Sequence, residues 1–592
     1  MEHFLPTSIK EMKALGWEQA DIILFTGDAY IDHPAFGTAV IARVLEAAGY
    51  KVAVIPQPNW RDDLRDFRKL GEPRLFFGVN SGAMDSMINH YTAAKRLRSN
   101  DAYTPEDRAG ARPDYAVSVY TGILKKLYPH IPVIIGGIEA SLRRFTHYDY
   151  WKDCLMGPVL DTSGADYLSY GMGERSMIAM ASYLDSHLQK MGLDSFSGFA
   201  ASKTAFNELA DNFPEEELPQ QIGWISSKAP DHGTIVLNSL KQCQESKKAF
   251  VESFNTIELQ ANKMHAQIMV EPLAGGRYFY LNPPYLPMSQ EELDAVYSLP
   301  FTRLPHPRYK GKFISAYEMI KDSVTTHRGC FGGCSFCTIA AHQGKFIQSR
   351  SHGNIVAEIE KIAARADFKG NLSDVGAPTA NMYGMGGKDS SICEKCIRKS
   401  CLSPNMCANL NNSHWNLLSL YSKIAKVKGI RHAYIGSGIR YDLFIGPQGF
   451  LGSGSKEYMT ELVKEHTCGR LKVAPEHTQS NVLALMNKPS FRLFEVFHNE
   501  FDRIVSQASL HCKLVPYFIS SHPGCTLKDM ESLSRNASLK GVYMEQVQDF
   551  TPTPMTRSSV MFYTGMELKT LAPIYVERNI DRKKKQKSLF FK

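Results

Sequence analysis

Seven of the chain's 12 cysteines fall between Cys330 and Cys407, in two tight groups. The chain has 592 residues, and its first residues contain no apolar segment of the kind that directs secretion. We therefore expect a cytoplasmic, reducing compartment, in which clustered cysteines indicate metal binding rather than disulfides. Any fold that this chain adopts has to gather each cysteine group in one place.

The first group lies in the segment HRGCFGGCSFC, in which Cys330, Cys334 and Cys337 have the spacing C-x3-C-x2-C. Three thiolates on a tight loop can each bind one iron of a cubane cluster, and the glycines between them let the backbone pass close to it. Three ligands for four irons leave one iron open, as a catalytic cluster requires. On spacing alone, a zinc site whose fourth ligand lies elsewhere stays open as an alternative.

The amino-terminal third alternates short apolar runs with helical segments. The runs cover residues 20–28, 51–55, 74–79, 132–137 and 165–171. Continuous apolar strands separated by helices indicate a parallel sheet covered on both faces, so we predict a doubly wound α/β domain over residues 1–190. Residues 191–310 contain a helical segment near 242–267 and a proline-rich stretch. They predict a helical and extended linker region.

The alternation resumes in residues 311–570. Six strand candidates are each followed by a helix or an insert: SVTTHR, LSDVG, RHAYIGSG, LKVAP, CKLVPYF and YMEQVQDF. This pattern predicts a partial (βα)6 barrel, in which loops after the strands carry the chemistry. The first cysteine group follows the first strand. Residues 571–592 form a basic tail whose last 12 residues supply +5 of the formal net charge of +8. We expect this tail to be solvated, so net charge does not indicate a nucleic-acid partner.

These features resemble the radical S-adenosylmethionine (SAM) superfamily. The cysteine spacing, Phe336 just before the last cysteine, and the position after a first barrel strand carry this likeness. Longer segments resemble the YgiQ family of radical SAM proteins, namely NPPYLPMSQEELDAVYSLPFTRLPHPRYKG, SVTTHRGCFGGCSFC, DVGAPTANMYG, CEKCIRKSCLSPNMCANLNNSH, GSGIRYDL, KVAPEHT and DFTPTPMTRSSVMFYTG. Nearly the whole chain is covered.

The resemblance implies a [4Fe-4S] cluster on Cys330, Cys334 and Cys337, with SAM bound at the open iron. It also implies reductive cleavage of SAM to a 5′-deoxyadenosyl radical that attacks a substrate which the sequence does not name. A reductant such as flavodoxin or ferredoxin would supply the electron. By the family pattern Phe336 would lie against the adenine; alternatively it is a core aromatic residue.

Further SAM contacts are expected where barrel strands end, because polar groups there face the site. Glycines at such ends allow a cofactor to approach closely, or simply end a strand. Each polar candidate could instead be a structural group. The candidates for cofactor binding are Asp374, Gly436, Ser437, Gly438, Glu476 and Gln548.

The second cysteine group has the spacing C-x2-C-x4-C-x5-C and lies in an insert near residues 390–410. Its members are Cys393, Cys396, Cys401 and Cys407. Four thiolates complete either a zinc site or a second iron–sulfur cluster, while unligated thiols would be an oxidation liability. We predict a closed second site that does not bind SAM; cluster, zinc and an unligated loop stay open.

The amino-terminal domain resembles the cobalamin-binding-like domains that precede the barrel in many radical SAM proteins. The axial-ligand motif D-x-H-x-x-G is not present, since the nearest segment, Asp32-His33-Pro-Ala-Phe-Gly37, has one residue too many between histidine and glycine. The sequence therefore argues against cobalamin. Residues 143–151, rich in polar and aromatic groups, either contact an anionic substrate or form a polar rim.

Two other functions stay open. A tRNA methylthiotransferase also uses a barrel triplet, but such enzymes hold a second cluster on three amino-terminal cysteines, where this chain has only Cys154 and Cys243. They also end in a small β-barrel RNA module that the sequence does not show. The other is a non-enzymatic zinc or iron–sulfur interaction protein. We expect no membrane partner, because no run of about 18 apolar residues occurs.

Overall fold

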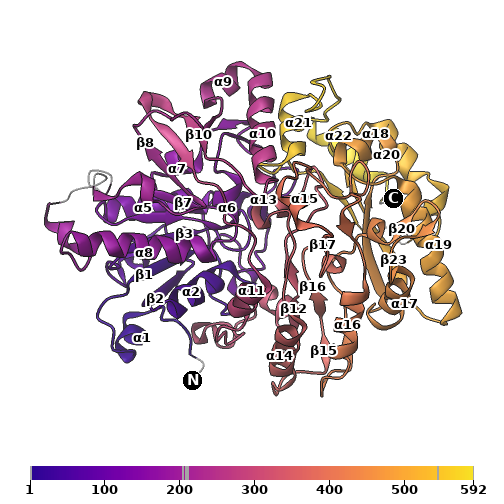
Figure 1. Ribbon diagram of the computed structural model, residues 1–592, viewed down its shortest axis with the longest axis horizontal. Helices are drawn as coiled ribbons and strands as arrows, with labels where there is room; N and C mark the ends of the chain where they lie inside the picture. Colours follow the sequence, from indigo (N-terminus) through magenta and orange to yellow (C-terminus); the bar gives the residue numbers. More distant parts are fainter. Residues whose placement is uncertain (1–2, 203–205, 207–211, 543–545, 591–592) are drawn as a thin grey trace. The chain divides into compact units, whose positions relative to one another are not determined.

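The structure is a computed structural model that describes residues 3–202, 206, 212–542 and 546–590 (Figure 1). The chain folds into two compact units. Unit 1 comprises Met1–Ile257, His265–Leu286 and Leu299–Lys321, and unit 2 comprises Glu258–Met264, Pro287–Ser298 and Asp322–Lys592. Among the helices of the described residues, none combines the length and apolarity needed to cross a bilayer.

Unit 1 is built on a nine-stranded sheet with the order β2-β1-β3-β4-β7-β8-β11-β10-β9. The first five strands in this order are parallel and almost entirely buried. They are β2 (Val52–Pro56), β1 (Ile22–Thr26), β3 (Phe76–Asn80), β4 (Val133–Ile135) and β7 (Tyr167–Ser169). Each coincides with one of the five predicted apolar runs. The predicted α/β class is therefore confirmed.

The other four strands come from the region predicted as a linker, residues 191–310. They are β8 (Ile222–Ser226), β9 (Ile235–Val236), β10 (Met269–Pro272) and β11 (Tyr278–Leu281). β8 pairs antiparallel with β7 and with β11, and β11 pairs antiparallel with β10. The prolines that follow β11 indicated an extended linker over this region, so the sequence pattern did not reveal these strands. The predicted helix near 242–267 is two helices, α9 (Leu240–Glu245) and α10 (Lys247–Ala261).

Four of the helices of unit 1 pack in two pairs. α2 (Gly37–Ala47) packs against α8 (Glu174–Lys190), and α5 (Ala116–Leu127) packs against α7 (Val159–Ser163) (Figure 1). β1 lies between β2 and β3 in the sheet. The chain adds β2 on one side of β1 and then adds β3 on the other side, so the strand order reverses direction at β1. The carboxyl ends of β1 and β3 are therefore the switch point, where doubly wound sheets commonly bind ligands.

Unit 2 contains the six predicted barrel strands in chain order. They are β12 (Ser323–Thr325), β15 with β16 (Asn371–Leu372, Asp374–Gly376), β19 (His432–Ala433), β22 (Arg470–Glu476), β23 (Lys513–Ser520) and β24 (Gln546–Asp549). Each pairs in parallel with the next, the third and fourth through a single bridge between Ile439 and Val473. Between them run the helices α14 (His352–Ala363), α16 (Trp415–Ile424), α17 (Ser455–Glu465), α19 (Phe491–Gln507) and α20 (Leu527–Ser534). The predicted partial (βα)6 barrel is confirmed.

The basic tail, which we expected to be solvated, forms helix α22 (Ile580–Ser588) and packs beside α20 and β24. Lys583 and Gln586 are buried, and the Gln586 Oε1 accepts from the Ser521 N–H at 2.9 Å. The Lys583 ammonium donates to the Phe550 carbonyl at 3.1 Å. Lys583 and Gln586 are three residues apart and therefore lie on the same face of the helix, so this strongly charged segment still packs two side chains against the barrel.

Candidate functional site

The first cysteine group lies in the loop that follows β12 and the short strand β13 (His327–Arg328). Its three thiols are free and half-buried: Cys330, Cys334 and Cys337. Backbone hydrogen bonds hold this loop at several points. The Cys330 N–H donates to the Gly344 carbonyl at 3.2 Å, and the Ser335 N–H donates to the Met486 carbonyl at 2.9 Å. The structure therefore places the triplet where the predicted barrel chemistry requires it.

Two glycines of this loop are required by close backbone contacts. Gly329 has φ +88°, and a Cβ there would lie 2.3 Å from the Phe346 carbonyl oxygen. Gly333 has φ +63°, and a Cβ there would lie 2.7 Å from the Lys399 carbonyl oxygen. Any side chain at either position would clash with neighbouring backbone as well as strain its own. These glycines thus allow the backbone at Phe346 and at Lys399 to pack closely against the cysteine loop.

A buried arginine that sequence reasoning missed faces the triplet. Arg440 Nη1 donates to Cys334 Sγ at 3.3 Å, while its Nε donates to Asp442 at 3.0 Å. Burial alone would raise the pKa of the Asp442 carboxyl, but the adjacent guanidinium outweighs it and holds that pKa below its usual value. A cationic donor to sulfur stabilises a thiolate. The available signal was the arginine in GSGIRYDL, three residues after Ser437.

The residues present fit a cluster that takes one thiolate per iron. A single tetrahedral ion needs its sulfurs about 2.3 Å from one common centre. A cubane instead spreads its ligands over separate irons. Three free thiols on one tethered loop, with Arg440 donating to one of them, suit such a group.

Three of the residues predicted to contact SAM lie together: Asp374, Gly436 and Ser437. Asp374 Oδ1 accepts from the backbone N–H groups of Gly436 at 2.9 Å and Ser437 at 3.1 Å, and the Ser437 hydroxyl donates to Oδ2. Burial raises the pKa of the Asp374 carboxyl. Because Asp374 lies at the start of β16, its carboxylate fixes the loop after β19. Gly438 is exposed, with open space where a Cβ would stand.

The other predicted contacts are more scattered. Glu476, at the end of β22, is buried with φ +68°, and its carboxylate lies 3.6 Å from the Lys488 ammonium. Burial raises the pKa of Glu476, and a non-glycine residue held at positive φ stores about 1–3 kcal/mol of strain, which is common at functional sites. The Phe336 ring meets His522 edge-on at 6.3 Å. Gln548 has an exposed side chain on β24 and does not join this group.

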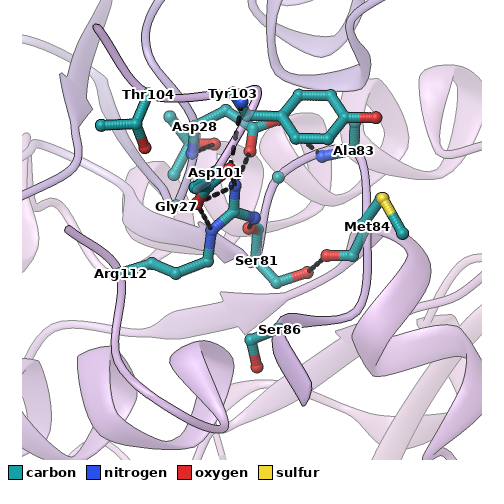
Figure 2. A network of polar contacts seen from close by, with 12 residues as sticks. Gly27, Asp28, Ser81, Ala83, Met84, Ser86, Asp101, Tyr103, Thr104 and Arg112 are labelled. Atoms are coloured by element: carbon teal, nitrogen blue, oxygen red, sulfur yellow. Dashed lines mark hydrogen bonds and ion pairs between the residues drawn. The ribbon is translucent and has the colours of Figure 1, made fainter. Parts of the chain in front are cut away.

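The carboxyl edge of the unit 1 sheet carries a different polar cluster, drawn in Figure 2. The buried Arg112 guanidinium lies 2.8 Å from Asp28 and 3.1 Å from Asp101, and its Nη1 donates to the Ser81 carbonyl at 2.7 Å. The Ala83 N–H donates to Asp28 at 2.6 Å. Burial raises the pKa of Asp28 to about 6. This edge, at the switch point, is filled by the chain's own paired charges.

The polar segment 143–151, whose role the sequence left open, is also internal. Arg143 is 3% exposed and forms ion pairs with Asp85 at 2.9 Å and Asp149 at 2.7 Å. The arginine and both carboxylates are removed from solvent together. This segment therefore forms a buried network within unit 1 rather than a rim.

Comparison with known proteins identifies the family. A family model described as "Radical SAM N-terminal" matches residues 4–323. A UPF0313 protein of Bacteroides thetaiotaomicron is 51% identical over 99% of this chain and 94% of its own length. The chain belongs to the UPF0313 family. A second UPF0313 relative, from Porphyromonas gingivalis, is 51% identical over 99% of this chain and 90% of its own length. These relatives confirm the predicted membership of the YgiQ family.

Solved structures similar to this UPF0313 chain include the radical SAM methyltransferase TsrM from Kitasatospora setae, with 12% identity and a TM-score of 0.47 over 91% of this chain and 75% of that one. Another is the cobalamin-dependent SAM radical enzyme OxsB, with 10% identity and a TM-score of 0.42 over 92% of this chain and 55% of that one. TsrM was solved with cobalamin and a [4Fe-4S] cluster bound, and OxsB with aqua-cobalamin.

These structures contradict our prediction against cobalamin. That prediction depended on a single loop histidine, His33, whose Nδ1 accepts from the Ala35 N–H at 3.0 Å. An axial histidine is one ligand among the many contacts by which a protein can hold a corrin. Its motif being out of register is therefore no ground for excluding the cofactor.

Proposed function

We propose that this UPF0313 chain is a radical SAM enzyme that holds a [4Fe-4S] cluster on Cys330, Cys334 and Cys337 and cleaves SAM reductively. One observation carries the proposal: three free thiols lie on a glycine-containing loop after the first strand of a six-stranded parallel partial barrel. When bound, the cluster supplies an electron that breaks the sulfonium bond of SAM and gives methionine and a 5′-deoxyadenosyl radical.

The chain's own residues prepare this loop for a charged group. Arg440, paired with Asp442 behind it, directs one N–H at Cys334 Sγ, so the thiolate form meets a fixed cation rather than water. Asn487 donates to the Gly333 carbonyl at 2.6 Å and holds the loop from the side of β22 and its following helix. Such fixed surroundings position ligands without reorganisation when the charge on them changes.

SAM would be received at the exposed turn after β19. Gly438 leaves open space there, and Ser437 is held by the Asp374 carboxylate. Phe336, half-buried beside Cys337, offers a ring surface for the adenine. Glu476 adds a buried carboxylate next to Lys488. A one-electron donor of the flavodoxin or ferredoxin class would supply the reductant.

The test is anaerobic reconstitution of the full chain with iron and sulfide, followed by strong reduction in the presence of SAM. We expect 5′-deoxyadenosine and methionine to form, and Cys334→Ala to abolish both. Cys468→Ala is the matched control, because Cys468 is a free, exposed thiol outside both cysteine groups. Cleavage that survives removal of all three triplet thiols would disprove the proposal.

A further inference from the structure

The second cysteine group packs directly on the first. The Cys401 N–H donates to the Phe331 carbonyl at 3.1 Å, and the Ser400 hydroxyl donates to the Gly332 carbonyl at 2.8 Å. Gly333, where no side chain fits, admits the Lys399 backbone. The insert near residues 390–410 is thus held against the triplet loop by hydrogen bonds to the backbone of that loop.

The insert is closed at its base and gathers four free thiols. β17 (Gly386–Gly387) and β18 (Leu410–Asn411) pair antiparallel, which brings the two ends of the insert together. Inside, the Cys396 N–H donates to the Cys393 carbonyl at 3.1 Å, and the Cys407 N–H donates to the Cys401 carbonyl at 2.7 Å. All four thiols are half-buried and none forms a disulfide.

Several donors point at these sulfurs. The Arg398 backbone N–H lies 3.4 Å from Cys396 Sγ, and the Asn409 side-chain amide lies 3.5 Å from Cys393 Sγ. Neutral thiols are weak acceptors, whereas thiolates draw such donors. The arrangement therefore suits sulfurs that carry negative charge.

A buried ammonium supplies an independent observation. Lys345 is 3% exposed, and its Nζ lies 3.7 Å from Cys396 Sγ and 2.8 Å from the Arg398 carbonyl. A buried cation is costly unless a negative group lies nearby. The group that Lys345 faces is the cysteine quartet, so the quartet is where that negative charge belongs.

We propose that Cys393, Cys396, Cys401 and Cys407 ligate a second [4Fe-4S] cluster, separate from the triplet and closed to SAM because all four irons have a protein ligand. Four thiolates can hold either a zinc ion or a cubane cluster, and the proposal commits to iron–sulfur, with zinc as an outcome that the metal analysis below would detect. This inference does not rest on the proposed function, since the two ligand sets share no residue.

The test counts iron and acid-labile sulfide in the anaerobically reconstituted full chain and in two variants. One variant replaces the triplet Cys330, Cys334 and Cys337 by Ala, and the other replaces Cys393, Cys396, Cys401 and Cys407 by Ser. We expect about eight irons in the unchanged chain and about four in each variant. Cys468→Ser, at an exposed free thiol, should leave the count unchanged.

Three outcomes would overturn the proposal: a quartet variant with the full iron content, a triplet variant that binds zinc instead of iron, or a triplet variant with no metal. If the quartet variant fails to fold, the triplet variant and Lys345→Met decide. The triplet variant must show one reduced cluster by electron paramagnetic resonance, and Lys345→Met in that background must alter its signal. Failure of the proposed function would give a different result. The triplet variant would then keep the iron content of the unchanged chain, the quartet variant would lose its iron, and the unchanged chain would not cleave SAM.

Discussion

Each unit contains a buried arginine near the strand ends discussed above, Arg112 in unit 1 and Arg440 in unit 2. The two arginines have different partners. In unit 1, Arg112 lies between the carboxylates of Asp28 and Asp101, and its third contact is a backbone carbonyl. In unit 2, Arg440 pairs with the single carboxylate of Asp442, and its Nη1 donates to Cys334 Sγ. In the first cluster, the arginine's partners are carboxylate and carbonyl oxygens. In the second, an arginine that is already ion-paired also donates to a sulfur of the candidate site.

This difference separates a structural cluster from one prepared for a ligand. Buried charges that are fully paired indicate a part of the fold whose removal costs stability. A buried cation that donates to a thiol sulfur favours the thiolate, which is the form that ligates a metal. The same reasoning distinguishes Arg143, between two carboxylates, from Lys345, which faces the second cysteine group.

The largest expected effect comes from removing the arginine of the unit 1 cluster. Arg112→Met leaves Asp28 and Asp101 buried without their cation, and should lower the free energy of unfolding of unit 1 by about 3–5 kcal/mol. Amide hydrogen exchange of β1 peptides measures this change locally. Arg65→Met, at an ion pair with Asp63 in which both side chains are exposed, is the control and should leave that exchange unchanged. Equal exchange in the two variants would contradict the comparison.

The next prediction concerns a buried carboxyl of unit 1 that is hydrogen-bonded to neutral groups. Glu271, on β10, accepts from the Thr146 N–H at 2.8 Å and from the Thr146 hydroxyl, and burial raises its pKa from 4.5 to about 7. The folded form therefore keeps a proton that the unfolded chain loses between these values. The contribution of Glu271 to stability is therefore most favourable below pH 4.5 and falls by about 1.4 kcal/mol per pH unit as the pH rises toward 7.

Hydrogen exchange of β10 at several pH values, corrected for intrinsic exchange, measures this slope. Glu271→Gln keeps the shape of the side chain and removes its titration, so the slope should flatten in that variant. A variant that keeps the full slope would show that another group is responsible.

The smallest predicted effect concerns Arg440. Replacing the pair together, Arg440→Met with Asp442→Asn, removes the donor to Cys334 without leaving a buried charge. Loss of a charged hydrogen bond of about 1.5–3 kcal/mol should make the midpoint potential of the proposed cluster more negative, by about 65–130 mV when the bond is made only in the reduced state. A redox titration followed by electron paramagnetic resonance measures it. Arg440→Lys, which keeps the cation, should shift less; an unchanged potential in the double variant would mean that Arg440 is only structural.

Much of the fold could be predicted because its strands are continuous apolar runs. Five such runs predicted β1, β2, β3, β4 and β7, and the alternation of six further strand candidates with helices or inserts predicted the barrel. The position of the triplet followed from its place after the first barrel strand. β8 to β11 could not be predicted in this way, because two to five residues beside prolines and polar side chains give no distinct period.

The surroundings of the site were hidden for a different reason. Arg440 and Cys334 are 106 positions apart, and Lys345 and Cys396 are 51 apart, so only the tertiary structure brings them together. The positive φ of Glu476 also has no sequence signal, since positive φ is normally marked by glycine. Asp374 was selected as a strand-end residue, but it sits at the start of β16 and holds a neighbouring loop.

Helix α22 has a consequence for proteolysis. Its outward face exposes Arg582, Lys584 and Lys585, which are cleavage sites for trypsin-like proteases. A cut there would detach Gln586 and leave the Ser521 N–H without the oxygen that now accepts from it. The next residue is His522, whose ring meets Phe336 of the cysteine loop. A cut in this basic helix would therefore remove a contact that supports the barrel beside the triplet.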